Sequence, residues 1–147
     1  MIEITQAHAE SSAPPSAFFA RWGDMATWPE WNADTEWVRL DGQFATGATG
    51  ILKPKGGPKV PFVVASLTDR EFVDVSRLLG ARLTFDHQVT PTAAGCRIDV
   101  RVTMTGPLAR VWALILGKGF RTTLQPDLDR LVALVEGEAP VGVPVPA

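Results

Sequence analysis

Residues 81–105 read ARLTFDHQVTPTAAGCRIDVRVTMT, and apolar and polar side chains alternate along both halves of this segment. Alternation with a period of two places successive side chains on opposite faces of a β-strand. We therefore predict two strands, over 81–90 and 96–105, joined by a short loop over 91–95.

The two faces of the first of these strands differ sharply in polarity. One face carries an apolar row with a single ionisable group, made of Leu83, Phe85, His87 and Val89. The other face is polar and carries Arg82, Thr84, Asp86 and Gln88. The apolar face is expected to turn inward, which places His87 among apolar neighbours.

Four further strands are predicted before this pair, at intervals of about ten residues. They cover 37–40, 47–54, 60–67 and 71–79. Turn signals such as Asp41-Gly42 and the basic loop over 53–59 separate them, which predicts an antiparallel meander of six strands. In the strand over 71–79, Asp74 and Ser76 face inward if Phe72 does, because the three share one parity.

Helical periodicity flanks the meander on both sides. A first strand over 2–10 leads into two short helices, over 12–22 and 25–31. Apolar residues then recur at helical steps over 107–136, which predicts one long amphipathic helix. We expect a single α+β domain over 1–137, in which a curved antiparallel sheet of about seven strands wraps round this C-terminal helix. The Pro-rich residues 138–147 are expected to form a flexible tail.

Composition narrows the classes of function. The 147 residues carry 14 Lys and Arg against 16 Asp and Glu, a net charge of −2 that argues against a nucleic-acid partner. A single cysteine excludes an internal disulfide, and one cysteine with two histidines is a poor set for a metal site. No cofactor is expected. No apolar run reaches the length of a membrane span and no signal peptide is visible, so we expect a cytoplasmic protein, monomeric or homodimeric.

Three segments, in this order, resemble the helix-grip (SRPBCC, START-like) superfamily. They are Ala13-Pro14-Pro15-Ser16-Ala17-Phe18-Phe19, Trp28-Pro29-Glu30-Trp31 and the amphipathic helix over 107–136. This superfamily includes the birch-pollen allergen, the steroidogenic lipid-transfer domains and the polyketide cyclase/dehydrase group. The resemblance covers residues 2 to about 137. It implies a helix-grip fold with an apolar pocket between sheet and long helix, holding a small organic ligand.

A sheet that curves round a helix leaves a wedge between the two, and large side chains should line it. The ligand-binding residues that we predict are Trp37, Phe44, Phe62, Phe72, Ser76, Phe85, Met104, Trp112 and Phe120. Tight core packing is the alternative for each of them. The remaining tryptophans, Trp22, Trp28 and Trp31, are interpreted chiefly as a lid and as packing of the short helices.

His87 is the candidate catalytic acid or base, with Asp74 on the neighbouring strand to orient its ring. The alternative is a neutral core histidine whose ring is satisfied by Asp74, Ser76 or a backbone group. No G-x-S-x-G motif is present, which argues against a serine hydrolase.

Three classes of function remain open from the sequence. The small number of reactive groups favours a binder or carrier of a hydrophobic small molecule, either a lipid or a polyketide-like compound. The second class is a polyketide cyclase/dehydratase-like enzyme that uses His87. The third is a regulatory module that binds a protein partner through an exposed sheet or groove.

Overall fold

The computed structural model describes residues 1–138, which form seven strands, two α-helices and one short 3-10 helix. In chain order these are β1 (Ile2–Ser11), α1 (Pro15–Gly23), η1 (Met25–Glu30), β2 (Thr35–Asp41), β3 (Thr49–Pro54), β4 (Val60–Leu67), β5 (Glu71–Leu78), β6 (Ala81–Pro91), β7 (Cys96–Thr105) and α2 (Ala109–Glu138). The order confirms the predicted helix-grip fold. The tail expected over 138–147 lies, beyond residue 138, outside the described residues.

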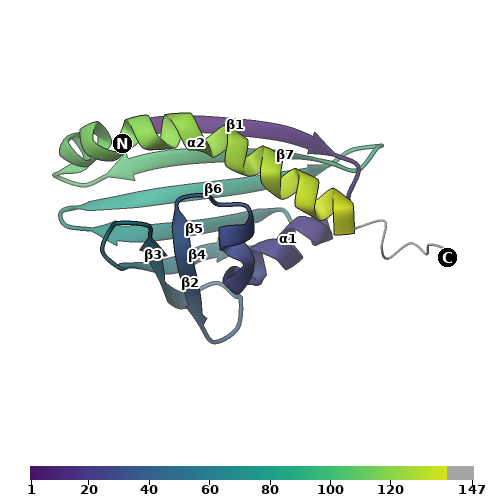
Figure 1. The fold of residues 1–147 in the computed structure, drawn as a ribbon, viewed down its shortest axis with the longest axis horizontal. Coiled ribbons are helices and arrows are strands. Elements are labelled where there is room, and N and C mark those ends of the chain that lie inside the picture. The colour runs from purple at the N-terminus through teal and green to yellow at the C-terminus, as the bar shows by residue number, and fades with distance from the viewer. Residues whose placement is uncertain (139–147) are drawn as a thin grey trace.

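All seven strands form one antiparallel sheet in the order β1-β7-β6-β5-β4-β3-β2. Strands β2 to β7 pair with their neighbours in sequence, and β1 completes the sheet by pairing with β7. Figure 1 shows α2 lying along the sheet on the side of β1 and β7, with α1 near its C-terminal end. Gly80 adopts a φ of +71° in the tight turn between β5 and β6, a conformation that glycine tolerates without strain.

Burial along the central strands follows the predicted alternation. On β6, Leu83, His87 and Val89 are buried, whereas Arg82 and Gln88 are exposed. The parity predicted for β5 is confirmed as well, because Phe72, Asp74 and Ser76 are all buried. One face of the sheet therefore carries two buried titratable side chains toward the helices.

The apolar interior divides into two clusters along the length of α2. The first, beneath the C-terminal half of α2, contains Trp22, Phe72 and Leu131 together with side chains of α1 and η1. The second, beneath its N-terminal half, contains Leu83 and Met104. Leu124 packs against both clusters, so it marks the boundary between the two halves of the interior.

The α2 helix is continuous over 30 residues, although Gly117, Gly119 and Pro126 lie within it. Its inward-facing residues Leu128, Leu131 and Val135 recur at helical steps and pack on the sheet. Within residues 1–138, no helix combines the length and the apolar character needed to cross a membrane.

Candidate functional site

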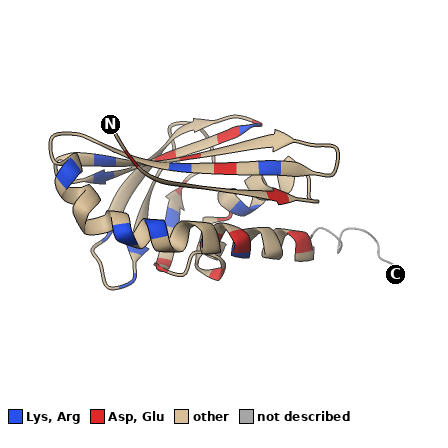
Figure 2. Cartoon of the chain, turned by 90° about the horizontal axis from the view of Figure 1, so that it is seen from above, with Lys and Arg blue, Asp and Glu red and all other residues tan. Residues whose placement is uncertain are grey.

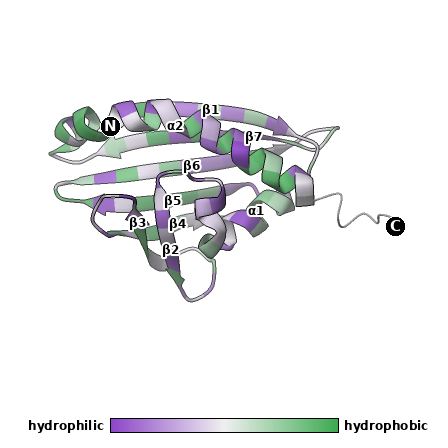
Figure 3. Cartoon of the chain, viewed as in Figure 1, coloured by the Kyte–Doolittle hydropathy of each residue, from purple (hydrophilic) through white to green (hydrophobic). Residues whose placement is uncertain are grey.

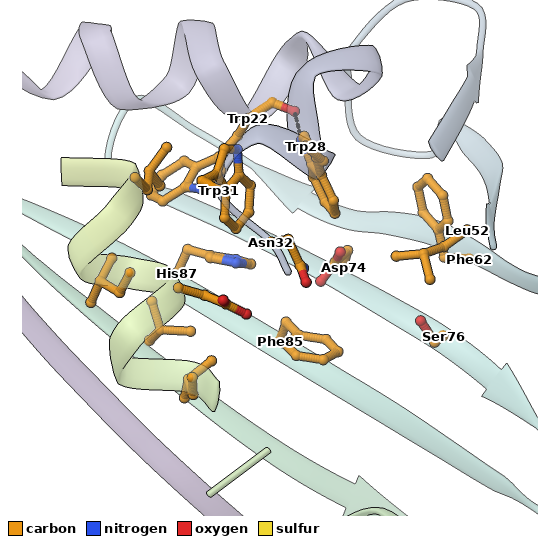
Figure 4. A pocket seen from close by; sticks show the side chains of 15 residues that line it. Trp22, Trp28, Trp31, Asn32, Leu52, Phe62, Asp74, Ser76, Phe85 and His87 are labelled. Carbon is orange, nitrogen blue, oxygen red and sulfur yellow. Dashed lines mark hydrogen bonds between the residues drawn. The ribbon is translucent and has the colours of Figure 1, made fainter. Parts of the chain in front are cut away.

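A cavity of about 80 Å³ lies between the sheet, the 3-10 helix η1 and the C-terminal half of α2. Its lining consists of Trp22, Trp28, Trp31, Asn32, Leu52, Phe62, Asp74, Ser76, Phe85, His87, Val100, Leu124, Asp127, Leu128 and Leu131. Most of these side chains are apolar, and a few polar ones point into the same space (Figure 4). Apolar walls with a small number of placed polar groups are typical of sites for small organic molecules.

The structure brings five of the predicted site residues together at this cavity. They are Phe62, Asp74, Ser76, Phe85 and His87. Their shared position follows from the register, because Ser76 pairs with Phe62 on β4 and Asp74 pairs with Phe85 on β6. Paired residues on adjacent antiparallel strands point to the same face of the sheet.

Five other predicted residues lie inside the protein but away from the cavity lining. Phe44 and Phe72 pack edge to face, with ring centroids 5.1 Å apart, in the first core cluster. Met104, Trp112 and Phe120 belong to the second cluster, beneath the N-terminal half of α2. These last three residues do not reach the cavity, because the cavity lies beneath the C-terminal half of α2 and does not extend along the whole helix.

Trp37 lies on the opposite face of the sheet from the cavity. The register of β2 against β3 shifts between Thr35 and Trp37, and Val38 then pairs with the cavity residue Leu52. Val38 is accordingly the inward residue, and the Nζ atom of Lys59 lies 5.8 Å from the centroid of the Trp37 ring. The sequence could not reveal this irregularity of register, which reverses the faces of the strand.

Trp22, Trp28 and Trp31 line the cavity, although the sequence indicated packing and a lid for them. The Trp28 indole Nε1 donates a hydrogen bond of 3.0 Å to the carbonyl of Trp22, which ties η1 to α1. Arg130 on α2 donates from Nη1 to the carbonyl of Trp31 (2.9 Å). The density of tryptophan over 22–31 was the available signal that an aromatic wall forms here.

The His87 imidazole is held by its neighbour across the sheet. Its Nδ1 lies 2.8 Å from the carbonyl oxygen of Phe72, the residue directly opposite on β5. The ring stacks on that of Phe72, with ring centroids 4.7 Å apart, and it packs against the Trp22 ring, with centroids 4.9 Å apart. A carbonyl oxygen can only accept, so Nδ1 carries the proton and Nε2 remains an acceptor. Burial lowers the pKa of His87 to about 4, and the ring is neutral at pH 7.

The Asp74 carboxyl is buried without a compensating charge. Desolvation raises the pKa of Asp74 to about 7, although a hydrogen bond from its own backbone N–H lowers it in part. Its Oδ1 is buried and has no hydrogen-bond partner among the described residues. A carboxyl group in this state exchanges a proton near neutral pH, and it either donates or accepts a hydrogen bond.

Two further groups make the cavity more polar beside η1. The indole Nε1 of Trp31 is buried, and the structure of residues 1–138 gives it no acceptor. Asp127 on α2 accepts hydrogen bonds from Arg130 Nη1 (2.9 Å) and from the backbone N–H of Ala33 (3.4 Å). Burial nevertheless raises the pKa of Asp127 above its usual value. The cavity thus offers an unused donor, an imidazole acceptor and a carboxyl group that can be either.

Solved structures with the same fold resemble the chain over most of its length. The di-domain ARO/CYC StfQ from the steffimycin biosynthetic pathway has a TM-score of 0.68 at 16% identity, covering 97% of this chain and 53% of that chain. Protein MLL2253 from Mesorhizobium loti has a TM-score of 0.67 at 16% identity, covering 90% and 96%. Ara h 8.0201 has a TM-score of 0.61 at 12% identity, covering 90% and 97%. At these identities the likeness shows the fold alone.

No curated protein matches the sequence. A family match does cover residues 1–136, to the family described as "Polyketide cyclase / dehydrase and lipid transport". This match spans nearly all of the chain that the structure describes, and it agrees with the helix-grip architecture. The chain therefore belongs to the polyketide cyclase / dehydrase and lipid transport family.

Proposed function

We propose that the protein binds a small hydrophobic molecule in the cavity beneath the C-terminal half of α2. The observation that carries this proposal is a buried apolar cavity containing two polar atoms without partners, Asp74 Oδ1 and Trp31 Nε1. A buried polar group left without a hydrogen bond costs about 1–3 kcal/mol. A guest molecule with a polar end satisfies both atoms and covers the apolar walls at the same time.

The size of the cavity limits what the closed form holds. A volume of about 80 Å³ is well below the roughly 300–1,000 Å³ typical of sites for drug-sized ligands. A lipid or polyketide-like ligand therefore requires the wall made by η1 and α2 to move outward. The hydrogen bond from Arg130 to the Trp31 carbonyl joins these two elements, so it must break or shift as the wall opens.

The polar atoms indicate what kind of hydrophobic molecule fits. The Trp31 indole donates and therefore suits a carbonyl or hydroxyl oxygen. His87 Nε2 accepts and suits a hydroxyl or phenol, and Asp74 suits either. This set favours a ring compound that bears carbonyl and hydroxyl groups over a plain hydrocarbon chain.

Binding can be tested with a substitution that fills the cavity. Ser76→Phe places a ring in the cavity, and the matched control Val75→Phe places the same ring on the opposite face of β5. Titration with the dye 1-anilinonaphthalene-8-sulfonate, followed through tryptophan fluorescence, should show affinity at least tenfold weaker for Ser76→Phe and near wild type for Val75→Phe. Native mass spectrometry of fresh protein should detect a copurifying adduct. Equal dye affinity in all three proteins contradicts the proposal.

The pKa of Asp74 favours a second candidate function, a dehydratase-like reaction on a β-hydroxy carbonyl compound. A general acid or base works best with a pKa near the working pH, which describes Asp74 (about 7) and not His87 (about 4). The protonated Asp74 carboxyl donates its proton to the leaving hydroxyl, which departs as water. The resulting carboxylate takes the proton from the carbon next to the carbonyl, which forms the double bond and restores the acid.

This second candidate is tested by separating binding from turnover. With a β-hydroxy carbonyl test substrate, Asp74→Asn should abolish formation of the dehydrated product while the dye still binds. Turnover that survives in Asp74→Asn rejects an acid–base role for this residue. A wild-type protein that binds the substrate and returns it unchanged is a carrier only.

A further inference from the structure

An exposed apolar surface lies at the end of the molecule where α2 begins. We call it the apolar patch, and it consists of Leu79, Leu108, Val111, Leu114 and Ile115. The exposed fraction of these side chains ranges from 39% for Leu108 to 86% for Leu114. Figure 3 shows hydrophobic residues in green along these first turns of α2. Single exposed apolar residues are common on protein surfaces, but several of them together usually mark an interaction site.

Hydrogen bonds join the two parts of the apolar patch. The Trp112 indole Nε1 donates to the carbonyl of Leu79 (2.8 Å), and the backbone N–H of Leu108 donates to the carbonyl of Gly80 (2.9 Å). These bonds hold the turn between β5 and β6 against the start of α2. The exposed residue Leu79 therefore belongs to a turn that lies directly beside the start of α2.

The first half of α2 is apolar on two sides. Its inner side, with Trp112 and Leu116, packs on the second core cluster. Its outer side presents Val111, Leu114 and Ile115, which are spaced i, i+3 and i+4 and so lie on one face. Large apolar side chains gathered on the solvent side of a helix usually mark a surface that another molecule covers.

The charged side chains of α2 next to the apolar patch are all positive. Residues 106–126 contain three charged side chains, Arg110, Lys118 and Arg121, and no acidic one. Arg77 and Arg82 pair across β5 and β6 next to the same turn, but their side chains lie on the face of the sheet opposite α2. Within residues 1–138 none of these five cations has an acidic partner. Figure 2 shows the basic residues along the first half of α2 and acidic ones toward its C-terminal end.

We propose that this face docks the protein on an anionic lipid bilayer, with the apolar patch buried at the level of the headgroups. An apolar helix face flanked by Lys and Arg is the arrangement that lies in a membrane interface. Cations near such a surface bind anionic headgroups, each strengthening binding by on the order of fivefold. A bilayer also needs no matching side chains, which suits a patch that carries no polar recognition group.

Charge argues against a second copy of this chain as the cover. A twofold interface places a surface patch against itself. Arg110, Lys118 and Arg121 of one copy would then lie next to the same three residues of the other, and like charges across an interface oppose association. Anionic lipid neutralises these cations and covers the apolar side chains together.

The proposal is tested by co-sedimentation with vesicles of pure phosphatidylcholine and of phosphatidylcholine with 30% phosphatidylglycerol. Wild-type protein should bind the anionic vesicles, and 0.5 M salt should weaken that binding. Leu114→Gln combined with Ile115→Gln should reduce binding at least tenfold, as should Arg110→Gln combined with Lys118→Gln. Glutamine is a good helix former, so these variants keep α2 intact.

Two control variants introduce glutamine outside this face. Ala133→Gln lies on the exposed side of α2 in its second half, and Arg70→Gln lies in the turn at the other end of β5. Both should bind vesicles like the wild type, and dye binding in the cavity should be unchanged in every variant because none of these residues lines it. A failure of docking is therefore distinguishable from a failure of cavity binding.

Three results would overturn the proposal. One is equal binding to neutral and anionic vesicles, and another is retained binding by both double variants. The third is a wild-type dimer in light scattering that the Leu114→Gln, Ile115→Gln variant converts to a monomer, with no vesicle binding by either. This last result assigns the apolar patch to a second copy of the chain.

Discussion

At the scale of single residues, burial moves the pKa values of Asp74 and His87 in opposite directions. Loss of solvent disfavours the charged form of each group, so it raises the pKa of the carboxyl and lowers that of the imidazole. The cavity at neutral pH therefore contains a neutral imidazole and a carboxyl near its midpoint, and not an ion pair. This arrangement favours proton exchange at Asp74 and hydrogen bonding at His87.

Asp74 should make the fold less stable as the pH rises. Its folded pKa of about 7 lies above the unfolded value of 3.8, so between these values the folded state holds the extra proton. Stability then falls as the pH rises through this window, by up to about 4 kcal/mol. We expect Asp74→Asn to be more stable than wild type at pH 8 and to lose that advantage at pH 4. Urea unfolding across this range measures the difference, and a constant difference at all pH values contradicts the prediction.

His87 should behave in the opposite sense. Its folded pKa of about 4 lies below the unfolded value of 6.5, so the unfolded chain takes up the proton first as the pH falls. Acidification from pH 6.5 to 4 therefore costs the folded state up to about 3 kcal/mol. Nitrogen-15 NMR should show a ring protonated at Nδ1 alone that does not titrate above pH 5. A transition near pH 6.5 in the folded protein would show that the ring is solvated.

At the scale of elements, β3 depends on a close approach that only glycine allows. A Cβ atom on Gly50 would collide with the backbone oxygen of Arg39 and with the ring of Phe62, which lines the cavity. We expect Gly50→Ala to lower the free energy of unfolding by about 1–3 kcal/mol. The same change at Gly119, where no atom lies within 4 Å, should raise it by about 0.5–1 kcal/mol. Urea denaturation tests the pair, and equal effects would refute the steric argument.

Regular alternation is the part of the fold that the sequence predicts well. It placed Asp74, Ser76 and His87 on the inner face, because β5 and β6 pair without irregularity along their length. Trp37 was placed in the lining for its size and not by alternation, and it lies on the other face, beside the register shift of β2. Such a shift depends on how two strands meet in space, and a pattern read along one strand does not contain it.

The long helix shows a second limit of the sequence. Its periodicity predicted the inward residues along the whole helix, but not which of them meet a cavity and which meet solid core. Trp112 and Phe120 are partly buried against the second cluster, whereas Leu128 and Leu131 line the cavity. Packing density is set by the sum of side-chain volumes across several elements, so it becomes visible only when those elements are assembled.

At the scale of the whole molecule, the two halves of α2 border different features of the protein. The C-terminal half covers the cavity together with η1, and the N-terminal half exposes the apolar patch with its cations. Leu124 lies between the two core clusters and packs against both. The two proposals therefore assign ligand binding to the C-terminal half of α2 and membrane docking to its N-terminal half.

This separation predicts that ligand-induced stabilisation and membrane docking respond to different substitutions. A ligand that binds only the folded state stabilises it by about 2.7 kcal/mol when its concentration is a hundred times its dissociation constant. For a domain of this size, each kcal/mol of stabilisation raises the Tm by roughly 2–4 °C. Saturating dye should therefore raise the Tm of wild type and of Leu114→Gln, Ile115→Gln equally. Ser76→Phe should show a much smaller rise, because its added ring occupies the cavity. Differential scanning fluorimetry that follows intrinsic tryptophan emission measures the Tm shift of all three proteins. A loss of the shift in the double variant would mean that the two surfaces are coupled through α2, contrary to the prediction.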